Sequence, residues 1–381
     1  MQTLNEIRNR INDIDDKIKQ LFLERMELAE KVADCKLCTN DKVLKPERET
    51  ELINMMSENV SQNVKNEYIS MLKTTIRVSR MHQYKYMLEK KPEKLEFHYS
   101  NRNKNPQTVV YQGLPASYQS QAARAMFPDA EIISHVESFE DVFKAVSYGK
   151  AEIGVVPIEN SSIGTINEVC DLLMKYDLYI SHSHINDIRH CLAGCKSATI
   201  DSVKQVYSIQ PALDQCKNYL SEKGFELCKA SNTAVAAQDI QKWNDITKAA
   251  VCSEDAAKLY GLDILMACIN DDKTNQTRFV AISKNLSASE NDNRVSIAFT
   301  LPHKEGTLSA ALSMFSDRNI NLTEIHSRPL EQTPWNYRFY ADFEGSLANE
   351  DTRSLIYQLS EELSSFRLLG SYQITKTSNE V

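Results

Sequence analysis

A cluster of polar residues follows a short apolar stretch near the middle of the chain. Ile153–Val156 is predicted to be a buried strand, because the run is short and rich in β-branched residues. Pro157 cannot donate to a following ladder, so the strand is expected to end there. A carboxylate, an amide and a hydroxyl come next, from Glu159, Asn160 and Ser161. Helical spacing resumes at Ile166–Met174, so these groups are expected at the carboxyl end of an α/β sheet, where ligands bind.

Similar groups recur where other predicted strands begin or end. Ser208 ends the strand Val203–Tyr207, and Gln215 is expected one to two turns into the next helix. Thr277 and Arg278 open a late strand. Each group alone is more simply explained as a helix cap or a turn. Their recurrence at strand ends predicts a shared ligand-binding cleft.

A long N-terminal segment, Leu4–Cys38, lacks Gly and Pro and carries apolar residues at heptad spacing. Arg25 interrupts this seam where an apolar residue is due. A later helix shares the feature, because Ser79 and Gln83 occupy the next two positions of its apolar stripe. A buried cation is costly unless it is neutralised. The pattern therefore favours a buried anionic ligand, and an internal ion pair is the alternative for Arg25.

Two basic residues of the long helix lie too far apart to serve one ligand. Arg8 and Lys36 share a heptad position but are separated by roughly 42 Å at 1.5 Å per residue. An antiparallel dimer would bring Arg8 of one subunit towards Arg25 and Lys36 of the other, and a wide apolar seam needs such a partner. A middle helix is predicted to begin near position 46, and it adds two charged groups near the same end, Arg48 and Glu49.

Composition excludes several classes of protein. The 381 residues are enough for two or three domains. The net charge of −8 disfavours nucleic acid or a membrane surface as partner, and no signal-peptide or membrane-span pattern occurs, so a cytoplasmic protein is expected. Nine scattered cysteines fit reduced thiols. His190, Cys191 and Cys195 are too few for a zinc site, and nucleotide-binding motifs are missing, so neither a metal nor a cofactor is expected.

The patterns predict three domains: helical at 1–90, α/β at 106–284 and α+β at 294–376. In the α/β domain, strands are expected at 108–111, 132–135, 153–156, 203–207, 225–228, 249–252 and 278–282. Their alternation with helices implies mainly parallel sheets. Two such blocks and a returning strand suggest two lobes, as in periplasmic solute-binding proteins. The last domain has the βαββαβ order of a ferredoxin-like fold.

The helical domain resembles the all-helical chorismate mutases, which are intertwined dimers. The matching positions are Arg8, Arg25, Lys36, Arg48, Glu49, Ser79 and Gln83. The resemblance implies an intramolecular rearrangement of chorismate, a dianion whose carboxylates suit arginine forks. Lys36 and Gln83 are the implied donors to the breaking ether oxygen, and Glu49 holds the ring hydroxyl. The arginines and Ser79 contact the substrate. Lys45 replaces the family's common Asp, which loses about 1 kcal/mol of helix capping and places an extra charge at the site mouth.

The segment from about Thr108 to Ser283 resembles the prephenate dehydratases. Three pieces carry the resemblance: Thr277-Arg278-Phe279, Pro157-Ile158-Glu159-Asn160-Ser161 with Gly164, and Ser208 with Gln215. The implied reaction expels the ring hydroxyl of prephenate together with its carboxylate, giving phenylpyruvate, water and CO2 without a cofactor. The leaving hydroxyl needs a strong donor or acid, which is Thr277 in this assignment, with Glu159 as a candidate acid. Arg278 has a structural or carboxylate-holding role. The implied substrate contacts are Asn160, Ser161, Ser208 and Gln215.

Two departures from this second family affect the assignment. Ala116 stands where the family has a glycine, and Ile209 stands where it has a histidine. A histidine at that position cannot be the acid of this enzyme, so more weight falls on Thr277 and Glu159. Whether Glu159 protonates the leaving hydroxyl or only orients its partners stays open.

The C-terminal domain resembles the ACT domain that follows prephenate dehydratases and binds phenylalanine between subunits. The expected effector loops contain Gly306, Leu308, Ser327 and Arg328. Thr307 and His326 depart from the residues usual in the family, which bears on the affinity for the effector. A purely structural dimerisation domain is the alternative, because a fold alone does not imply a function.

Together the resemblances lead to one hypothesis, a bifunctional chorismate mutase and prephenate dehydratase. Its substrates are chorismate and prephenate, phenylalanine is its effector, and it forms a homodimer or a higher homo-oligomer. Two alternatives remain: a dehydratase whose helical domain is inactive and only dimerises, and a non-catalytic ligand-binding regulator with the same two-lobed core.

Overall fold

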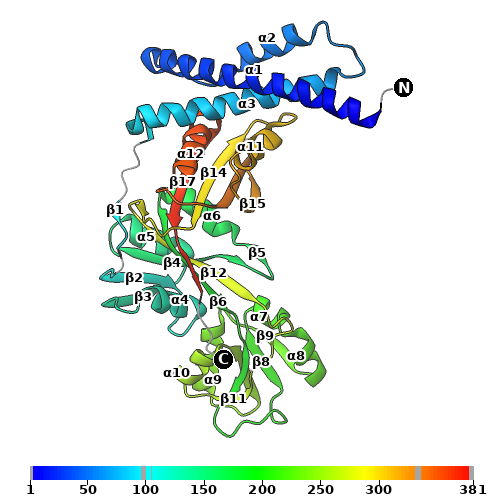
Figure 1. The fold of residues 1–381 in the computed structure, drawn as a ribbon. Helices are drawn as coiled ribbons and strands as arrows, with labels where there is room; N and C mark the ends of the chain where they lie inside the picture. The colour runs from blue at the N-terminus through cyan, green and yellow to red at the C-terminus, as the bar shows by residue number, and fades with distance from the viewer. Residues whose placement is uncertain (1–2, 96–99, 104, 331–335, 377–381) are drawn as a thin grey trace. The chain divides into compact units, whose positions relative to one another are not determined.

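The computed structural model describes residues 3–95, 100–103, 105–330 and 336–376 (Figure 1). The chain forms two compact units. The first combines Met1–His98 with Ile297–Arg367, and the second combines Tyr99–Ser296 with Leu368–Val381. The helices of the described residues do not reach the combined length and apolar character of a membrane span.

Helix α1 (Leu4–Thr39) confirms the long N-terminal helix predicted from the heptad pattern. It begins at a capping box formed by Thr3 and Glu6, which satisfies two of the free backbone amides at the helix start. Asn40 ends it in a left-handed conformation. The apolar positions of its first turns are exposed within the chain: Leu4, Ile7, Ile11, Ile14, Ile18 and Leu21. The N-terminal part of the predicted seam therefore has no packing partner in one copy of the described chain.

Two further helices complete the helical domain. Helix α2 (Pro46–Ser57) begins at Pro46, as predicted, and α3 (Lys65–Lys90) packs against α1 before a short 3-10 turn at Pro92–Leu95. A buried cluster closes the end of this domain and includes one residue of α12 (Glu350–Glu362): Ala33, Val43, Tyr84, Met87, Leu88 and Tyr357. The rings of Tyr84 and Tyr357 meet edge to face at 5.3 Å. Helix α12 therefore shares a core with the helical domain.

The C-terminal module has the predicted βαββαβ element order. Its elements are β14 (Arg294–Leu301), α11 (Thr307–Ser316), β15 (Leu322–Pro329), β16 (Tyr337–Glu344), α12 and β17 (Ser364–Tyr372). The strands lie in the order β15-β16-β14-β17. This order puts the first strand between the third and the fourth, the arrangement expected of a ferredoxin-like module.

The larger sheet of the second unit has the strand order β6-β12-β4-β2-β3. The strands are β2 (Thr108–Gln112), β3 (Ile132–Val136), β4 (Ile153–Asn160), β6 (Tyr179–Asp187) and β12 (Gln276–Ser283). Helices α4 (Tyr118–Met126), α5 (Phe139–Ser147) and α6 (Asn167–Tyr176) pack against this sheet. Two short strands extend this sheet, β5 (Gly164–Thr165) on β4 and β18 (Ile374–Lys376) on β6. Strands β1 (Ser100–Asn101) and β13 (Ser287–Ala288) form a separate two-stranded sheet.

The expectation of mainly parallel sheets is wrong for half of this sheet. Strands β2, β3 and β4 are parallel, but β12 runs antiparallel to both β4 and β6. Strand β6 was not predicted, because buried positions in it carry polar side chains. Ser181 and Ser183 are buried, and their hydroxyls donate to carbonyls of β12 at 3.2 Å each. Buried polar groups are tolerated when they are bonded in this way, and they hide the strand from apolar patterning.

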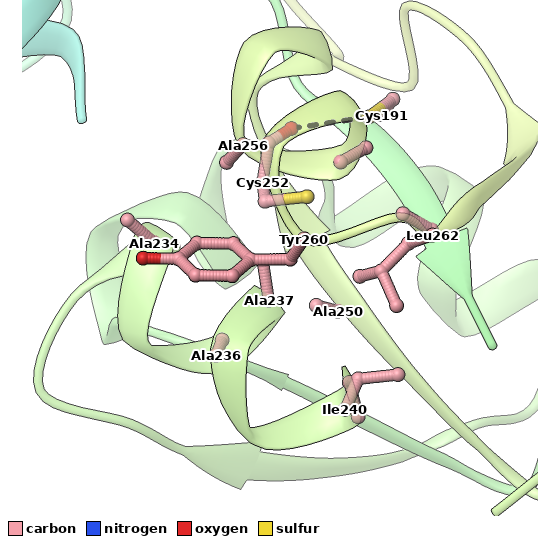
Figure 2. Close-up of a cluster of buried hydrophobic side chains, with 12 residues drawn as sticks. Cys191, Ala234, Ala236, Ala237, Ile240, Ala250, Cys252, Ala256, Tyr260 and Leu262 are labelled. Atoms are coloured by element: carbon pink, nitrogen blue, oxygen red, sulfur yellow. Dashed lines mark hydrogen bonds between the residues drawn. The ribbon is translucent and has the colours of Figure 1, made fainter. Parts of the chain in front are cut away.

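A second, smaller sheet forms the other lobe and confirms the two-lobed α/β prediction. Its order is β11 (Asp263–Met266), β7 (Cys191–Gly194), β10 (Lys248–Cys252), β8 (Gln205–Ser208) and β9 (Glu226–Lys229). Helices α7 (Gln210–Asp214), α8 (Lys217–Lys223), α9 (Thr233–Trp243) and α10 (Glu254–Leu259) accompany it. Figure 2 shows one of its cores, where the ring of Tyr260 lies among the alanines of α9. The small alanine side chains allow the close approach of this helix to the sheet.

The strand that contains Pro157 does not end there. Strand β4 continues to Asn160, and Pro157 pairs with Phe279 beside a register shift in β12. The pairing of β2 with β4 reaches only Val155. Pro157 therefore lies next to a bulge, where β4 has a neighbouring strand on one side only, and a missing amide donor is tolerated at such positions.

The helix predicted after Ser208 is broken in two. Gln215 is the C-cap of α7, not a residue one to two turns into a longer helix. Asp271 accounts for the break, because its backbone amide donates to the Gln215 carbonyl at 2.8 Å and its carboxylate accepts from the Asn218 amide. These tertiary contacts replace the intrahelical bonds that would have continued the helix.

Candidate active sites

The first candidate site lies between α1 and α3. Ser79 and Gln83 are buried on α3, as their stripe positions predict. Lys36 of α1 donates to the side-chain oxygen of Gln83 at 3.2 Å and to the backbone carbonyl of Val43 at 2.9 Å. Gln83 in turn donates to the Ser79 carbonyl at 3.3 Å. An ammonium has three protons and an amide has two, so Lys36 and Gln83 each keep a donor beyond these bonds.

The surroundings of Lys36 disfavour its charged form. Partial burial lowers the pKa of Lys36, and the like charge of Lys45 lowers it further, against the opposing effect of Asp41. Lys45 pairs with Asp41 at 2.8 Å and gives α2 no side-chain cap, as its side chain predicts. The expected extra charge at this position is therefore present and acts on Lys36.

The arginines predicted for this site are placed unequally. Arg25 is half-buried and donates to the Thr75 carbonyl of α3 at 3.3 Å, and burial lowers its pKa. No carboxylate partner of Arg25 occurs among the ion pairs of the described residues, so the internal ion pair is not observed. Arg8 is exposed, and Arg48 makes only an exposed pair with Glu51 at 3.5 Å. One copy of the chain does not bring Arg8 or Arg48 to Lys36.

Arg80 is a site neighbour that sequence reasoning missed. Its guanidinium contacts both oxygens of Glu49, at 2.6 and 2.7 Å, and both oxygens of Glu362 in α12, at 2.9 and 3.2 Å. Burial opposes the charge of Arg80, but the two carboxylates outweigh it and raise its pKa. Glu49 is thus held by a cation while its remaining lone pairs stay available to a ligand hydroxyl. Helical periodicity gives no signal for such a residue, because its partner Glu362 lies 282 residues away in the sequence.

The second candidate site lies where β4 pairs with the start of β12. Asn160 and Thr277 are directly opposite each other, and the Asn160 amide donates to the Thr277 hydroxyl oxygen at 2.8 Å. The same amide lies 2.9 Å from the side-chain oxygen of Asn275. The Asn160 oxygen accepts from the backbone amides of Ser162 and Ile163. Asn160 is thus fixed at both ends of its amide, and it meets Thr277 as a donor.

Ser161 and Gly164 shape the loop beside this pair. Ser161 exchanges two backbone-directed bonds with Gln276, both 2.9 Å long. Gly164 has a φ of +85°, a conformation that a residue with a side chain rarely adopts. The loop and the start of β12 are therefore held together by hydrogen bonds that surround Asn160 and Thr277.

Arg278 is buried and links three elements. It donates to Glu159 at 3.1 Å and to the hydroxyl of Tyr372 at 3.2 Å, and Tyr372 meets Ser296 at 2.6 Å. The Arg278 guanidinium thus occupies one oxygen of the Glu159 carboxylate. This contact supports the structural alternative for Arg278 and favours an orienting role for Glu159 over that of an acid.

The remaining predicted dehydratase residues lie in the smaller lobe. The Ser208 hydroxyl is fully buried and donates to the Val251 carbonyl of β10 at 2.7 Å, so the geometry lends no support to a substrate contact by Ser208. Gln215 is half-buried at the end of α7, with its oxygen 3.1 Å from His190. A pocket of about 410 Å³ between α4 and α10 includes none of the predicted residues.

The predicted effector residues lie on two elements of the C-terminal module. Gly306, with a φ of +78°, is the N-cap of α11, and Leu308 is exposed in its first turn. Ser327 and Arg328 belong to strand β15, not to a loop as expected, and Ser327 is on its exposed face. Groups of His, Cys, Asp or Glu that could hold a metal ion do not occur in the part of the chain that the structure describes.

Two polar clusters on different scaffolds, one helical and one α/β, are the arrangement expected of an enzyme with two sites. Residues 7–84 match the family model of chorismate mutase type II, and residues 109–287 match that of prephenate dehydratase. The bifunctional chorismate mutase/prephenate dehydratase of Aquifex aeolicus is 31% identical over 98% of both chains. This chain belongs to the family of bifunctional chorismate mutase/prephenate dehydratases. It rearranges chorismate to prephenate and converts prephenate to phenylpyruvate.

Two further relatives match the α/β part of the chain. Arogenate dehydratase/prephenate dehydratase 2 of Arabidopsis thaliana is 37% identical over 71% of this chain and 73% of its own. The structure of a prephenate dehydratase from Arthrobacter aurescens in complex with L-Phe has a TM-score of 0.64 and 25% identity, over 70% of this chain and 90% of that one. These matches agree with the predicted dehydratase resemblance.

Proposed function

We propose that the two activities belong to separate domains and use the two polar clusters described above. Residues 1–90 form the mutase, residues 106–284 the dehydratase and residues 294–376 a regulatory module. The family models support the first two ranges, because each match lies inside or close to its range. The observation that carries the site assignment is the bond between Asn160 and Thr277, two residues brought together from 117 positions apart.

In the mutase, the proposed chemistry is positioning and electrostatic stabilisation. Chorismate is held in its compact conformer, and negative charge develops on the ether oxygen as the C–O bond breaks. Lys36 and Gln83, joined at 3.2 Å, each offer a remaining proton to that oxygen. Glu49, fixed by Arg80, accepts from the ring hydroxyl. Arg25 and Ser79 complete the contacts to the substrate carboxylates from the same subunit.

The mutase site is completed, in this proposal, by a second copy of the chain. The apolar face of α1 from Leu4 to Leu21 is exposed, and an antiparallel second copy of α1 would cover it. The same pairing supplies Arg8 to the site that contains Arg25 and Lys36. The exposure of Arg8 in a single copy supports this role.

Mixed dimers test the shared site. Arg8→Ala and Arg25→Ala chains are each expected to lose most mutase activity, because every site in either homodimer lacks one guanidinium. In a heterodimer of the two chains, one site lacks both arginines and the other has both. We expect mutase activity to return towards half that of the unaltered dimer. Differently tagged chains purified as verified heterodimers give the measurement, and no recovery would contradict a shared site.

In the dehydratase, the proposed step is a concerted loss of hydroxide and carboxylate. The ring C–O bond breaks as the leaving hydroxyl takes up a proton, which solvent returns to the donor. The C–C bond to the carboxylate breaks, its electron pair completes the aromatic ring, and the carboxylate leaves as CO2. Thr277 is the donor to the leaving hydroxyl, because Asn160 occupies its oxygen as a donor and leaves the hydroxyl proton free to point elsewhere. Asn160, Ser161 and Gln215 bind the substrate, and Arg278 holds Glu159.

The C-terminal module is proposed to bind phenylalanine and to inhibit the enzyme. The similar structure from Arthrobacter aurescens, determined with L-Phe, supports this effector. The proposed binding residues are Gly306, Leu308, Ser327 and Arg328. Thr307 differs from the family's usual alanine, and its hydroxyl is bonded to the carbonyls of Pro302 and Lys304 within the loop. The loop therefore tolerates this substitution without an unpaired hydroxyl.

Product analysis from chorismate, with and without phenylalanine, tests the whole proposal. Pure protein is expected to consume chorismate and to accumulate phenylpyruvate, and phenylalanine is expected to slow phenylpyruvate formation. If prephenate is turned over but chorismate is not, the helical domain only dimerises. If phenylalanine has no effect and does not bind, the C-terminal module is structural.

A further inference from the structure

A chain of hydrogen bonds joins three side chains of the second unit. The hydroxyl of Tyr118, the first residue of α4, lies 3.1 Å from Nδ1 of His190. Nε2 of His190 lies 3.1 Å from the side-chain oxygen of Gln215, at the end of α7. Tyr118 belongs to the lobe of the larger sheet and Gln215 to the lobe of the smaller one. His190, in the connection between β6 and β7, joins the two.

The imidazole of His190 is held in place on several sides. It is only 3% exposed, and its ring meets that of Tyr118 edge to face at 5.6 Å. Its backbone amide donates to Asn270 at 2.6 Å. Burial lowers the pKa of His190 to about 4, so the ring is neutral near pH 7. A neutral imidazole has one donor and one acceptor nitrogen, and the two neighbours decide which is which.

Two hydrogen-bond patterns satisfy this chain. In the first, Tyr118 donates to Nδ1, Nε2–H donates to the Gln215 oxygen, and the Gln215 NH2 group faces away from His190. In the second, Tyr118 donates to the carbonyl of Arg189, which lies 2.8 Å away, and both bonds of His190 reverse. Gln215 then turns its NH2 group to His190 and its oxygen outward. The direction of one hydroxyl proton thus sets which end of the Gln215 amide is free.

The same connection also reaches the Thr277 cluster. The backbone amide of Ile188 donates to the Asn275 carbonyl at 2.8 Å, and the Asn275 side chain accepts from Asn160. His190 therefore follows, by two residues, a position that is tied to the proposed dehydratase site.

A carboxylate of prephenate accepts hydrogen bonds and does not donate them. It can therefore be bound by the Gln215 NH2 group of the first pattern and is repelled by the Gln215 oxygen of the second.

We propose that Tyr118 and His190 are positioning residues that hold the Gln215 amide with its NH2 group towards a carboxylate of the substrate. The proposal rests on the proposed role of Gln215 in substrate binding. Neither residue touches the substrate; both act through Gln215. The side-chain oxygen of Gln215, not its NH2 group, lies 3.1 Å from Nε2, and this fits the first pattern. In that pattern the Tyr118 hydroxyl donates to Nδ1, and without the hydroxyl Nδ1 loses the donor that keeps it an acceptor.

Steady-state kinetics of phenylpyruvate formation from prephenate test this role. Tyr118→Phe is expected to raise KM roughly fivefold, the change in binding expected when one hydrogen bond is lost, and to leave kcat within about twofold of the unaltered enzyme. Gln215→Ala is expected to raise KM about tenfold or more, because a bond to a charged group is lost. Gln215→Glu keeps the acceptor for His190 but has no NH2 group, so it is expected to raise KM at least as much as Gln215→Ala.

A double variant separates this role from a merely structural one. If Tyr118 acts through Gln215, Tyr118→Phe adds nothing to KM in a Gln215→Ala background. Tyr219→Phe is the matched control, because it removes a buried tyrosine hydroxyl that has no hydrogen-bond partner in the described chain, and it is expected to leave KM unchanged.

The outcomes distinguish substrate binding by Gln215 from the positioning of Gln215 by Tyr118 and His190. A normal KM for both Gln215 variants overturns the binding role of Gln215 and the further inference with it. A raised KM for the Gln215 variants, with a normal KM for Tyr118→Phe, overturns the inference alone. Additive effects in the double variant also overturn it, because they show that Tyr118 acts by another route. If the Tyr118→Phe protein folds poorly, the two Gln215 variants still test the proposal. A KM for Gln215→Glu below that for Gln215→Ala contradicts the need for the NH2 group.

Discussion

Lys36→Ala is expected to lower the rate of chorismate consumption by about 10²–10³, the usual cost of removing one donor to a developing negative charge. The partly buried ammonium of Lys36 is bonded to Gln83 and Val43, so its position is fixed before the substrate binds. Phenylpyruvate formation from added prephenate is expected to stay unchanged. Chorismate absorbance measures the first activity and phenylpyruvate absorbance the second, on the same protein.

The control for this variant is Lys31→Ala, which removes an exposed lysine from the same helix. It is expected to leave both activities unaltered. Because Lys36 also donates to the Val43 carbonyl, its loss could loosen the segment before α2. Lys36→Gln keeps a donor of similar reach without the charge, so it separates loosening from lost electrostatic stabilisation. A Lys36→Ala protein that keeps a third or more of the mutase rate would show that Lys36 is not the donor to the ether oxygen.

Thr277→Ala is expected to lower phenylpyruvate formation from prephenate by about 10², within the range for a lost proton donor. The Thr277 hydroxyl is buried and accepts from Asn160. Thr277→Ser keeps this hydroxyl and is expected to retain most of the activity. Thr277→Val keeps the shape without the hydroxyl and is expected to be as slow as Thr277→Ala. Chorismate mutase activity is the internal control, because Thr277 lies outside the helical domain.

Comparison with Glu159→Gln decides between the two candidate donors. Glu159 is paired with Arg278 at 3.1 Å, which fits an orienting role, so its replacement is expected to cost less activity than the loss of the Thr277 hydroxyl. A Thr277→Val enzyme as fast as the unaltered one, together with an inactive Glu159→Gln enzyme, would transfer the role of acid to Glu159.

The helical site was predictable because its residues interrupt a regular pattern. Polar side chains at apolar positions of a helix must lie inside, and Arg25, Ser79 and Gln83 do so or come close to it. Arg80 could not be found in this way, because it follows Ser79 off the stripe and one of its partners, Glu362, is 282 residues away. Contacts between distant segments leave no trace in local periodicity.

The α/β part was predicted less completely, for three different physical reasons. Strand β6 was missed because its buried serines are satisfied by carbonyls of a neighbouring strand. Strand β4 passes Pro157 because a bulge removes the need for its amide. Helix α7 stops at Gln215 because Asp271 takes over its hydrogen bonds. In each case a tertiary contact overrode a correct local preference.

The guanidinium of Arg80 binds carboxylates from two distant parts of the chain, so the helical domain depends on contacts with α12. Glu362 supplies one of its two carboxylates, and Tyr357 closes the core beside Tyr84. A gene fragment that ends after residue 90 would therefore encode helices with a half-neutralised arginine next to Glu49 and an uncovered aromatic ring. Recombination that exchanges the last domain between relatives must preserve α12 as well as the effector loops. The packing of the helical domain thus depends on a helix that lies outside residues 1–90.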